Sequence, residues 1–192
     1  MVNNAAIAHE CPTYFIDEDE HVIRNMIEIN CSAQLEMCRI MIPIMKKHGR
    51  GLILNIGSLL GSIPTGLQVT YSATKAFLKT FSLGLSMELA QDNILVQHVN
   101  TCYVVSDMSK IKRSSWMVPT PKDYVKSVIS QVGCGKSITP YPSHKLITFL
   151  SRCLPTWILM AFIFSHMKKH HLKAQKRLLD AQKSKNDDAI TK

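Results

Sequence analysis

Apolar residues recur at helical spacing over residues 19–48 and again over residues 71–91. Two short runs, 52–56 and 94–99, follow these segments and are rich in aliphatic and β-branched residues. The runs are nearly continuous rather than alternating, which is typical of strands covered on both faces of a parallel sheet. The order helix, strand, helix, strand therefore predicts an α/β fold with a parallel sheet between helices.

Glycine, proline and asparagine mark the ends of these elements. Residues 49–51 end the first helix, Asn93 ends the second, and residues 57–66 form a loop rich in Gly, Ser and Pro. Further along, the pattern predicts a helix over residues 121–132 and a short last strand over residues 138–140. The 192 residues suffice for one domain of ordinary size.

A second apolar stretch runs from Leu146 to Phe164, and a basic tail follows it. As one continuous helix it would be about 28 Å long, close to the thickness of a bilayer core. Arg152 and Pro155 lie in its middle and weaken a membrane-spanning interpretation. We expect an apolar helix that packs on the domain, lies in a membrane surface or spans it, with the basic tail at anionic headgroups.

The charge distribution supports a division into a domain over residues 1–145 and a membrane-associated extension over residues 146–192. Residues 167–192 hold eight Lys or Arg and three Asp, so +5 of the formal net charge of +9 lies there. We therefore predict no nucleic-acid partner. The six cysteines form no C-x-x-C pair and no secretory leader pattern is present, so we expect a reducing compartment and no metal site.

Three side chains form a candidate proton-transfer site. Tyr71 and Lys75 are four residues apart on a predicted helix and share one face. Ser58 follows the predicted strand 52–56, at the carboxyl end where ligands bind in α/β sheets. An ammonium near a phenol lowers the phenol pKa from its usual value of about 10, which suits proton exchange with a carbonyl or alcohol. A Tyr-x-x-x-Lys pair is common, however, and the alternative is that these are ordinary surface and turn residues.

The wider context of these residues resembles the short-chain dehydrogenase/reductase family. Residues 55–58 read Asn-Ile-Gly-Ser, and residues 71–77 read Tyr-Ser-Ala-Thr-Lys-Ala-Phe. Residues 3–6 are similar to the Asn-Asn-Ala-Gly element after the fourth strand of that family, and Ile29-Asn30 is similar to its helix Asn. The resemblance covers residues 2 to about 145 and implies the later part of a Rossmann-like, doubly wound parallel sheet.

Within the family, residues 108–121 are most similar to the fungal microsomal 3-ketoacyl-CoA reductases of very-long-chain fatty-acid elongation. The resemblance implies that NADPH reduces the 3-oxo group of a very-long-chain acyl-CoA. It also implies a catalytic domain that faces the cytosol from the endoplasmic reticulum membrane. The expected partners are the long-chain acyl-CoA substrate, the membrane, and other enzymes of fatty-acid elongation.

The resemblance also implies roles for individual residues. Tyr71 would donate the proton, Lys75 would lower the Tyr71 pKa and hold the nicotinamide ribose, and Ser58 would orient the carbonyl. Asn30 would support a proton-relay water. The remaining expected cofactor contacts are Asn4, Val104 and Ser106.

Two features depart from the family pattern. The 192 residues contain no G-x-G-x-x-G cofactor loop, and Ala6 replaces the Gly of Asn-Asn-Ala-Gly. We therefore expect an N-terminally truncated form without the first strands of the sheet, which alone does not bind NADPH measurably. A catalytically inactive remnant with a membrane- or partner-binding role is one alternative. A 17β-hydroxysteroid dehydrogenase related to types 3 and 12 is the other.

Overall fold

The computed structural model describes residues 1–190, and its four strands form one parallel sheet in the order β1-β2-β3-β4. The centre of this sheet is the pairing of β2 with β3. Because all strands run in the same direction, the loops after them open at one edge of the sheet. This arrangement confirms the predicted α/β fold with a parallel sheet. The strands are β1 (Val2–Asn3), β2 (Gly51–Ile56), β3 (Ile94–Val99) and β4 (Ser137–Ile138).

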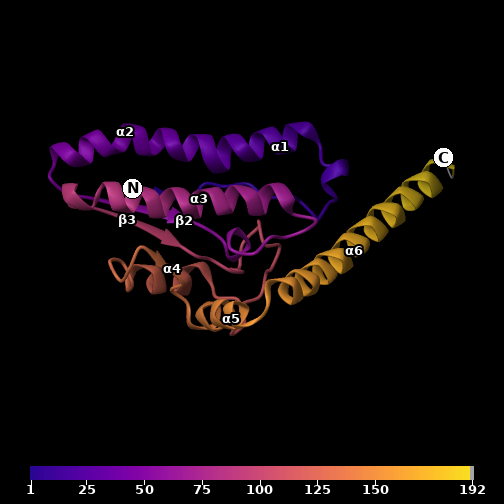
Figure 1. The fold of residues 1–192 in the computed structure, drawn as a ribbon. Coiled ribbons are helices and arrows are strands. Elements are labelled where there is room, and N and C mark those ends of the chain that lie inside the picture. The colour runs from indigo at the N-terminus through magenta and orange to yellow at the C-terminus, as the bar shows by residue number, and fades with distance from the viewer. Residues whose placement is uncertain (191–192) are drawn as a thin grey trace.

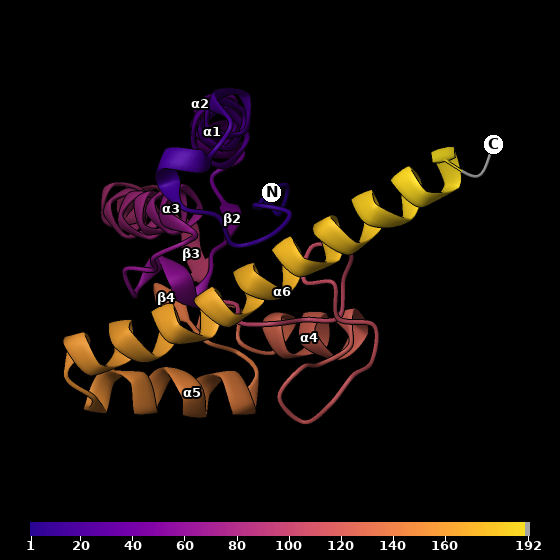
Figure 2. The same cartoon turned by 90° about the vertical axis from the view of Figure 1, so that its right-hand side faces the viewer.

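Helices cover both faces of the sheet (Figure 1). α1, α2 and α3 lie on one face, and α4 and α5 lie on the other. α6 leaves this body and crosses the side of the molecule at which the strands end (Figure 2). The helices are α1 (Glu20–Ile27), α2 (Ala33–Lys47), α3 (Val69–Glu88), α4 (Pro121–Ile129), α5 (Pro142–Cys153) and α6 (Thr156–Ile190).

Side chains of the two central strands contribute to two hydrophobic cores, one on each face of the sheet. Ile53 and Val96 point toward α2 and α3, whereas Leu54 and Val99 point toward α4. Each such side chain contributes about 1.5–3 kcal/mol when it is fully buried. The continuous apolar pattern of these strands therefore reflects coverage on both faces.

The first predicted helix contains an irregular turn. α1 and α2 form one rod, but a π-helical turn over Glu28–Ser32 joins them. The second predicted helix, α3, begins two residues earlier than expected, at Val69. Asn93 ends the turn that follows it in the left-handed conformation, with φ of 56°, as its position predicts.

The prediction of one continuous apolar helix over residues 146–164 is wrong. α5 ends at Cys153 and α6 begins at Thr156, because Pro155 lacks an N–H and clashes with the preceding helical turn. Among the residues that the structure describes, no helix is both long and apolar enough to cross a membrane. The predicted domain boundary at 145/146 falls inside α5, and the last two residues of the predicted tail lie outside the described residues.

Candidate active site

The three residues of the predicted proton-transfer site come together at the strand-end edge of the sheet. Ser58 follows β2 directly, and its Oγ accepts a hydrogen bond from the Leu60 N–H at 3.2 Å. Its hydroxyl is close enough to Tyr71, in the first turn of α3, to lower the pKa of the phenol. Lys75 stands one turn further, with its Nζ 5.8 Å from the centroid of the Tyr71 ring.

Lys75 is a buried cation with few partners. Its side chain is 3% exposed, and Nζ donates one hydrogen bond, to the Ile56 carbonyl oxygen at 3.1 Å. Burial lowers the pKa of Lys75 to about 8, and the nearby Cys31 thiol opposes that shift. Because an ammonium has three donors, Lys75 can donate to a further acceptor at the strand-end edge.

The surroundings of Tyr71 favour the protonated form of its phenol. Burial raises the pKa of the phenol above 10, the Ser58 hydroxyl lowers it, and Tyr103 raises it slightly. A phenol with a raised pKa is protonated at neutral pH but is a weaker acid, so proton donation requires a charge that stabilises the phenolate. The role predicted for Lys75, which is to lower the Tyr71 pKa, stays a prediction because burial is the largest influence in this structure.

Asn30 links the loop after β1 to α3 and is completely buried. Its Nδ2 donates to the Ile7 carbonyl oxygen at 2.8 Å and to Thr74 Oγ1 at 3.2 Å, and its Oδ1 accepts from the Ile7 N–H at 2.9 Å. Asn30 belongs to the π-helical turn, a feature that is frequent at functional sites. The structure therefore shows a positioning role for Asn30, and its relay role stays a prediction.

The expected cofactor contacts lie in segments that follow β1 and β3. Asn4 is exposed directly after β1. Ser106 is also exposed, and its Oγ donates to the Val104 carbonyl oxygen at 3.3 Å. Both segments leave the sheet at the same edge as Ser58, because the strands are parallel. Their contact with a cofactor stays a prediction.

A buried contact between a histidine and a carboxylate beside the site was missed by the sequence analysis. His9 Nε2 lies 2.9 Å from Glu18 Oε1, and the two side chains are 4% and 1% exposed. Thr70 Oγ1 donates to the other oxygen of Glu18 at 2.6 Å. This contact ties the loop after β1 to the residue that precedes Tyr71. No spacing in the sequence indicates it, because the three residues belong to separate segments.

A second missed residue, His144, holds the segment after β3. His144 Nε2 donates to the Tyr103 carbonyl oxygen at 3.1 Å, and Nδ1 accepts from the Cys102 N–H at 3.5 Å. Burial lowers the His144 pKa, which favours the neutral ring that this pattern requires. His144 thereby fixes the backbone immediately before Val104.

The nicotinamide end of a dinucleotide fits these residues. The unused donors of buried Lys75 and the phenol of Tyr71 offer hydrogen bonds to ribose hydroxyls. The described residues contain no group of three or more His, Cys, Asp or Glu side chains that could hold a metal ion. The protonated Tyr71 phenol with the Lys75 ammonium beside it suits carbonyl chemistry in which this chain transfers the proton.

Comparison with known proteins agrees with this geometry. The short chain dehydrogenase family model matches residues 1–116. The very-long-chain 3-oxoacyl-CoA reductase of Coprinopsis cinerea is 46% identical over 158 residues, covering 78% of this chain and 47% of the relative. The Bos taurus protein of the same name is 37% identical over 160 residues, covering 82% of this chain and 51% of the relative. The chain thus spans about half the length of the curated relatives that it matches.

Solved structures show the same fold. A short-chain dehydrogenase from Sphingobium yanoikuyae in complex with NADPH has a TM-score of 0.64 and 26% identity, covering 74% of this chain and 57% of that one. A 3-ketoacyl-(acyl-carrier-protein) reductase from Brucella melitensis complexed with NADH has a TM-score of 0.62 and 24% identity, covering 72% and 62%. With the family match over more than half of its residues, this chain belongs to the short chain dehydrogenase family.

Proposed function

We propose that this chain carries the proton-transfer part of an NADPH-dependent reductase that converts very-long-chain 3-oxoacyl-CoA to 3-hydroxyacyl-CoA. The observation that carries the proposal is the grouping of Ser58, Tyr71 and Lys75 at the strand-end edge. The names of the fungal and bovine relatives support the acyl-CoA substrate.

Ser58 and Tyr71 have different roles at the carbonyl oxygen of the substrate. Ser58 donates a hydrogen bond to this oxygen and orients it, and Tyr71 transfers its O–H proton to it. A bound nicotinamide cofactor supplies the hydride to the carbonyl carbon. The Lys75 ammonium then stabilises the phenolate left on Tyr71, which regains a proton from solvent. The raised Tyr71 pKa keeps this acid protonated between turnovers.

The same proposal places the chain on the cytosolic side of the endoplasmic reticulum membrane, near other enzymes of fatty-acid elongation. Its support is the outer surface of α5 and α6, where Phe149, Trp157 and Phe162 are 61%, 72% and 70% exposed. Cations of α6 such as Lys168 and Lys169 are exposed as well. Apolar residues beside cations suit a surface that rests on anionic lipid.

The test is a Tyr71→Phe substitution. It is made in this chain and in a fusion that adds the part of the Coprinopsis cinerea reductase preceding the region of similarity. We expect the fusion to oxidise NADPH with 3-oxoacyl-CoA and Tyr71→Phe to lower turnover at least 100-fold, the size typical of lost general acid catalysis. NADPH binding by the fusion should persist, because the ring remains.

Tyr14→Phe is the matched control and should keep full turnover, because Tyr14 packs on α6 and not on Ser58. Turnover of the Tyr71→Phe fusion above about 1% of the parent would remove Tyr71 from the acid role. Turnover of a 17-oxosteroid but not of 3-oxoacyl-CoA would overturn the substrate assignment. The 192-residue chain alone is expected to bind NADPH too weakly to measure.

A further inference from the structure

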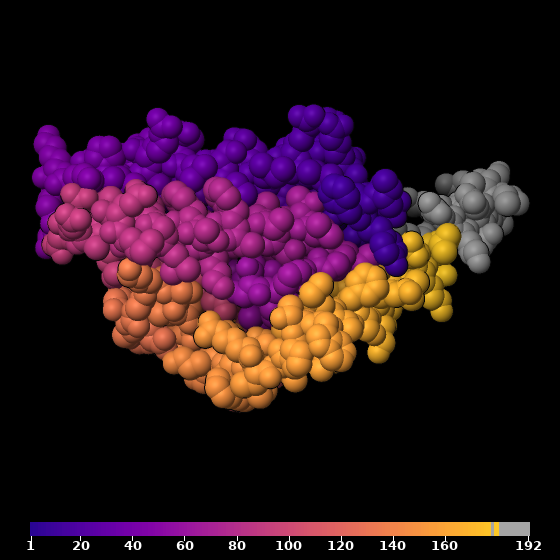
Figure 3. Space-filling view, viewed as in Figure 1, coloured from indigo at the N-terminus to yellow at the C-terminus, as the bar shows by residue number. Residues whose placement is uncertain are grey.

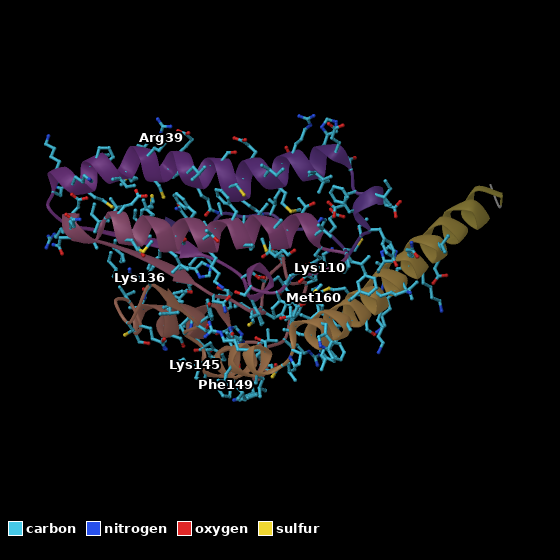
Figure 4. All side chains as sticks on the ribbon, in the orientation of Figure 1. Arg39, Lys110, Lys136, Lys145, Phe149 and Met160 are labelled. Carbon is cyan, nitrogen blue, oxygen red and sulfur yellow. The ribbon has the colours of Figure 1, made fainter. Side chains whose placement is uncertain are left out.

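An apolar groove lies beside α3, outside the proton-transfer site. It has a volume of about 470 Å³ and is walled mainly by the loop after β2, by α3 and by one residue of α6. Its apolar wall residues include Leu60, Ile63, Pro64, Ala73, Ala76 and Met160. Figure 4 shows Met160 where the start of α6 meets the body of the domain. A volume of this size is within the range of small-molecule sites.

A smaller basic pocket of about 260 Å³ adjoins this groove, between the loop after β2 and the junction of α5 with α6. Lys79 of α3 and Arg152 of α5 line it, together with four hydroxyl side chains: Ser62, Thr148, Ser151 and Thr156. Lys79 Nζ donates to Ser62 Oγ at 3.0 Å. Among the described residues, neither cation forms an ion pair and no acidic residue lines the pocket.

The groove and the basic pocket are neighbours that share two wall residues. Ser62 and Ile63 line both, so a cationic, hydroxyl-rich pocket lies next to an apolar groove. A ligand that satisfies both ends has an anionic head and a hydrocarbon tail. Arg and Lys form their strongest hydrogen bonds with phosphate and carboxylate groups.

We propose that the groove and the basic pocket together form a binding site for a single-chain anionic amphiphile. The alkyl chain occupies the groove against Met160 and Ile63, and a phosphate head binds Lys79 and Arg152. The phosphate can belong to a lysophospholipid or to an acyl-CoA, because both present an anion at the end of a long chain. None of the reactive residues Ser58, Tyr71 and Lys75 lines either pocket.

The site was not evident from the sequence because its parts are remote. Lys79 and Arg152 belong to separate helices, and Pro155 turns α6 so that Met160 meets the loop after β2. The proposal does not depend on proton transfer by Tyr71, because it concerns binding to residues other than Ser58, Tyr71 and Lys75. It can therefore fail or succeed independently of Tyr71.

The experiment uses calorimetry to measure the binding of three probes to the full chain. The probes are decyl phosphate below its micelle concentration, decanol below its solubility limit, and inorganic phosphate. We expect decyl phosphate to bind saturably with one molecule per chain, and more tightly than either partial probe. Arg152→Gln and Lys79→Gln should each weaken decyl phosphate at least tenfold and leave decanol unchanged. Met160→Trp fills the groove and should weaken decyl phosphate and decanol alike.

Matched controls lie on the outer face of α5, where Lys145 and Phe149 are labelled in Figure 4. Lys145→Gln removes one cation and Phe149→Ser one exposed aromatic ring, but neither residue lines the two pockets. Both should bind decyl phosphate as the parent does. The proposal is overturned if binding is not saturable, if the controls lose as much affinity as the pocket variants, or if the Arg152 and Lys79 variants bind normally.

Two further probes separate the sources of the phosphate. Decanoyl lysophosphatidic acid presents a headgroup phosphate, and decanoyl-CoA presents the nucleotide phosphates. The one that competes better with decyl phosphate identifies the physiological class. Failure of both to compete, in a chain that binds decyl phosphate, would overturn the assignment to these natural ligands. Circular dichroism of each variant separates lost binding from lost folding.

Discussion

The segment from β2 through β3 and the pair α5–α6 differ in the exposure of their large apolar side chains. Ile53, Leu78 and Val99 of the first region are completely buried, whereas Phe149 and Trp157 of the second are 61% and 72% exposed. The apolar side chains of the first region are therefore covered by the helices packed on the sheet, whereas the second region leaves an apolar face exposed. The comparison separates the part of the chain that holds the reactive groups from the part whose apolar side chains remain exposed.

The attachment of the two regions differs as well. The first region is tied internally by buried polar contacts, such as Asn55 Nδ2 donating to Ser82 Oγ at 2.8 Å. α6 is held by few contacts: Phe164 covers Gly66, and His171 Nδ1 donates to the Pro12 carbonyl oxygen at 2.6 Å. Figure 3 shows the C-terminal segment reaching the loop near the N-terminus at one end of the molecule. Destabilising substitutions in the first region should therefore unfold the chain. Substitutions at the contacts of α6 should detach this helix from the rest of the domain.

The largest expected effect is that of Gly57→Ala. A Cβ at this position would lie 1.9 Å from His98 Nε2 and 2.7 Å from its ring carbons; Gly57 directly follows β2, and His98 is a buried residue of β3. Overpacking of this severity should lower the free energy of unfolding by about 3 kcal/mol or more. Urea denaturation followed by circular dichroism measures it.

The matched control for that substitution is Gly84→Ala in α3, where an added Cβ meets nothing within 4 Å. Alanine is the better helix former by about 1 kcal/mol, so this variant should be as stable as the parent or more stable. Equal stability of the Gly57 and Gly84 variants would contradict the rigid close approach between Gly57 and His98.

A second test of the buried region uses acid. Burial and the charges of Lys79 and Lys75 lower the His98 pKa to about 4, against about 6.5 in an unfolded chain. As pH falls from 6.5 to 4, the unfolded state binds a proton that the native state does not. Stability should therefore fall over this window, with a His98 contribution on the order of 3 kcal/mol.

The measurement is the urea midpoint at pH 7 and pH 4.5 for the parent and for His98→Gln, which does not titrate. The parent should lose more stability than the variant between these pH values. NMR titration of the His98 ring in the folded chain provides a second check, and an ordinary pKa near 6.5 there would refute the prediction.

A smaller effect is expected when α6 is released. His171→Ala removes the hydrogen bond to Pro12 and the edge contact with the Tyr14 ring, centroids 5.3 Å apart. The loss should be about 1 kcal/mol, seen as faster proteolysis within α6 while the urea transition of the sheet hardly moves. His166→Ala is the control on the same helix. If the two variants are cleaved at equal rates, His171 does not hold α6.

The smallest effect on stability belongs to the exposed apolar face. Phe149→Ser and Trp157→Ser should change the free energy of unfolding by less than about 0.5 kcal/mol. Each should nevertheless reduce co-flotation with vesicles of phosphatidylcholine and phosphatidylserine, because both rings are available to lipid. Ile40→Ser is the control, an exposed apolar residue of α2, which lies on the other face of the sheet. Unchanged flotation of the α5–α6 variants would argue against the membrane surface.

Local patterns were sufficient to predict much of the site. Tyr71 and Lys75 share a face because they are one helical turn apart, and Ser58 follows a strand whose apolar run is recognisable. Both inferences need only the helical repeat and the direction of parallel strands. The resemblance added Asn30, whose bonds to Ile7 and Thr74 the spacing alone does not indicate.

The sequence by itself determined the elements that satisfy their own hydrogen bonds and bury their own apolar faces. Only the tertiary structure decided the contacts between remote segments. It paired His9 with Glu18 beside Thr70, and it set Lys79 and Arg152 around one pocket. It also raised the Tyr71 pKa, because burial is a property of the assembled chain and a sequence pattern shows only which residues are able to be buried.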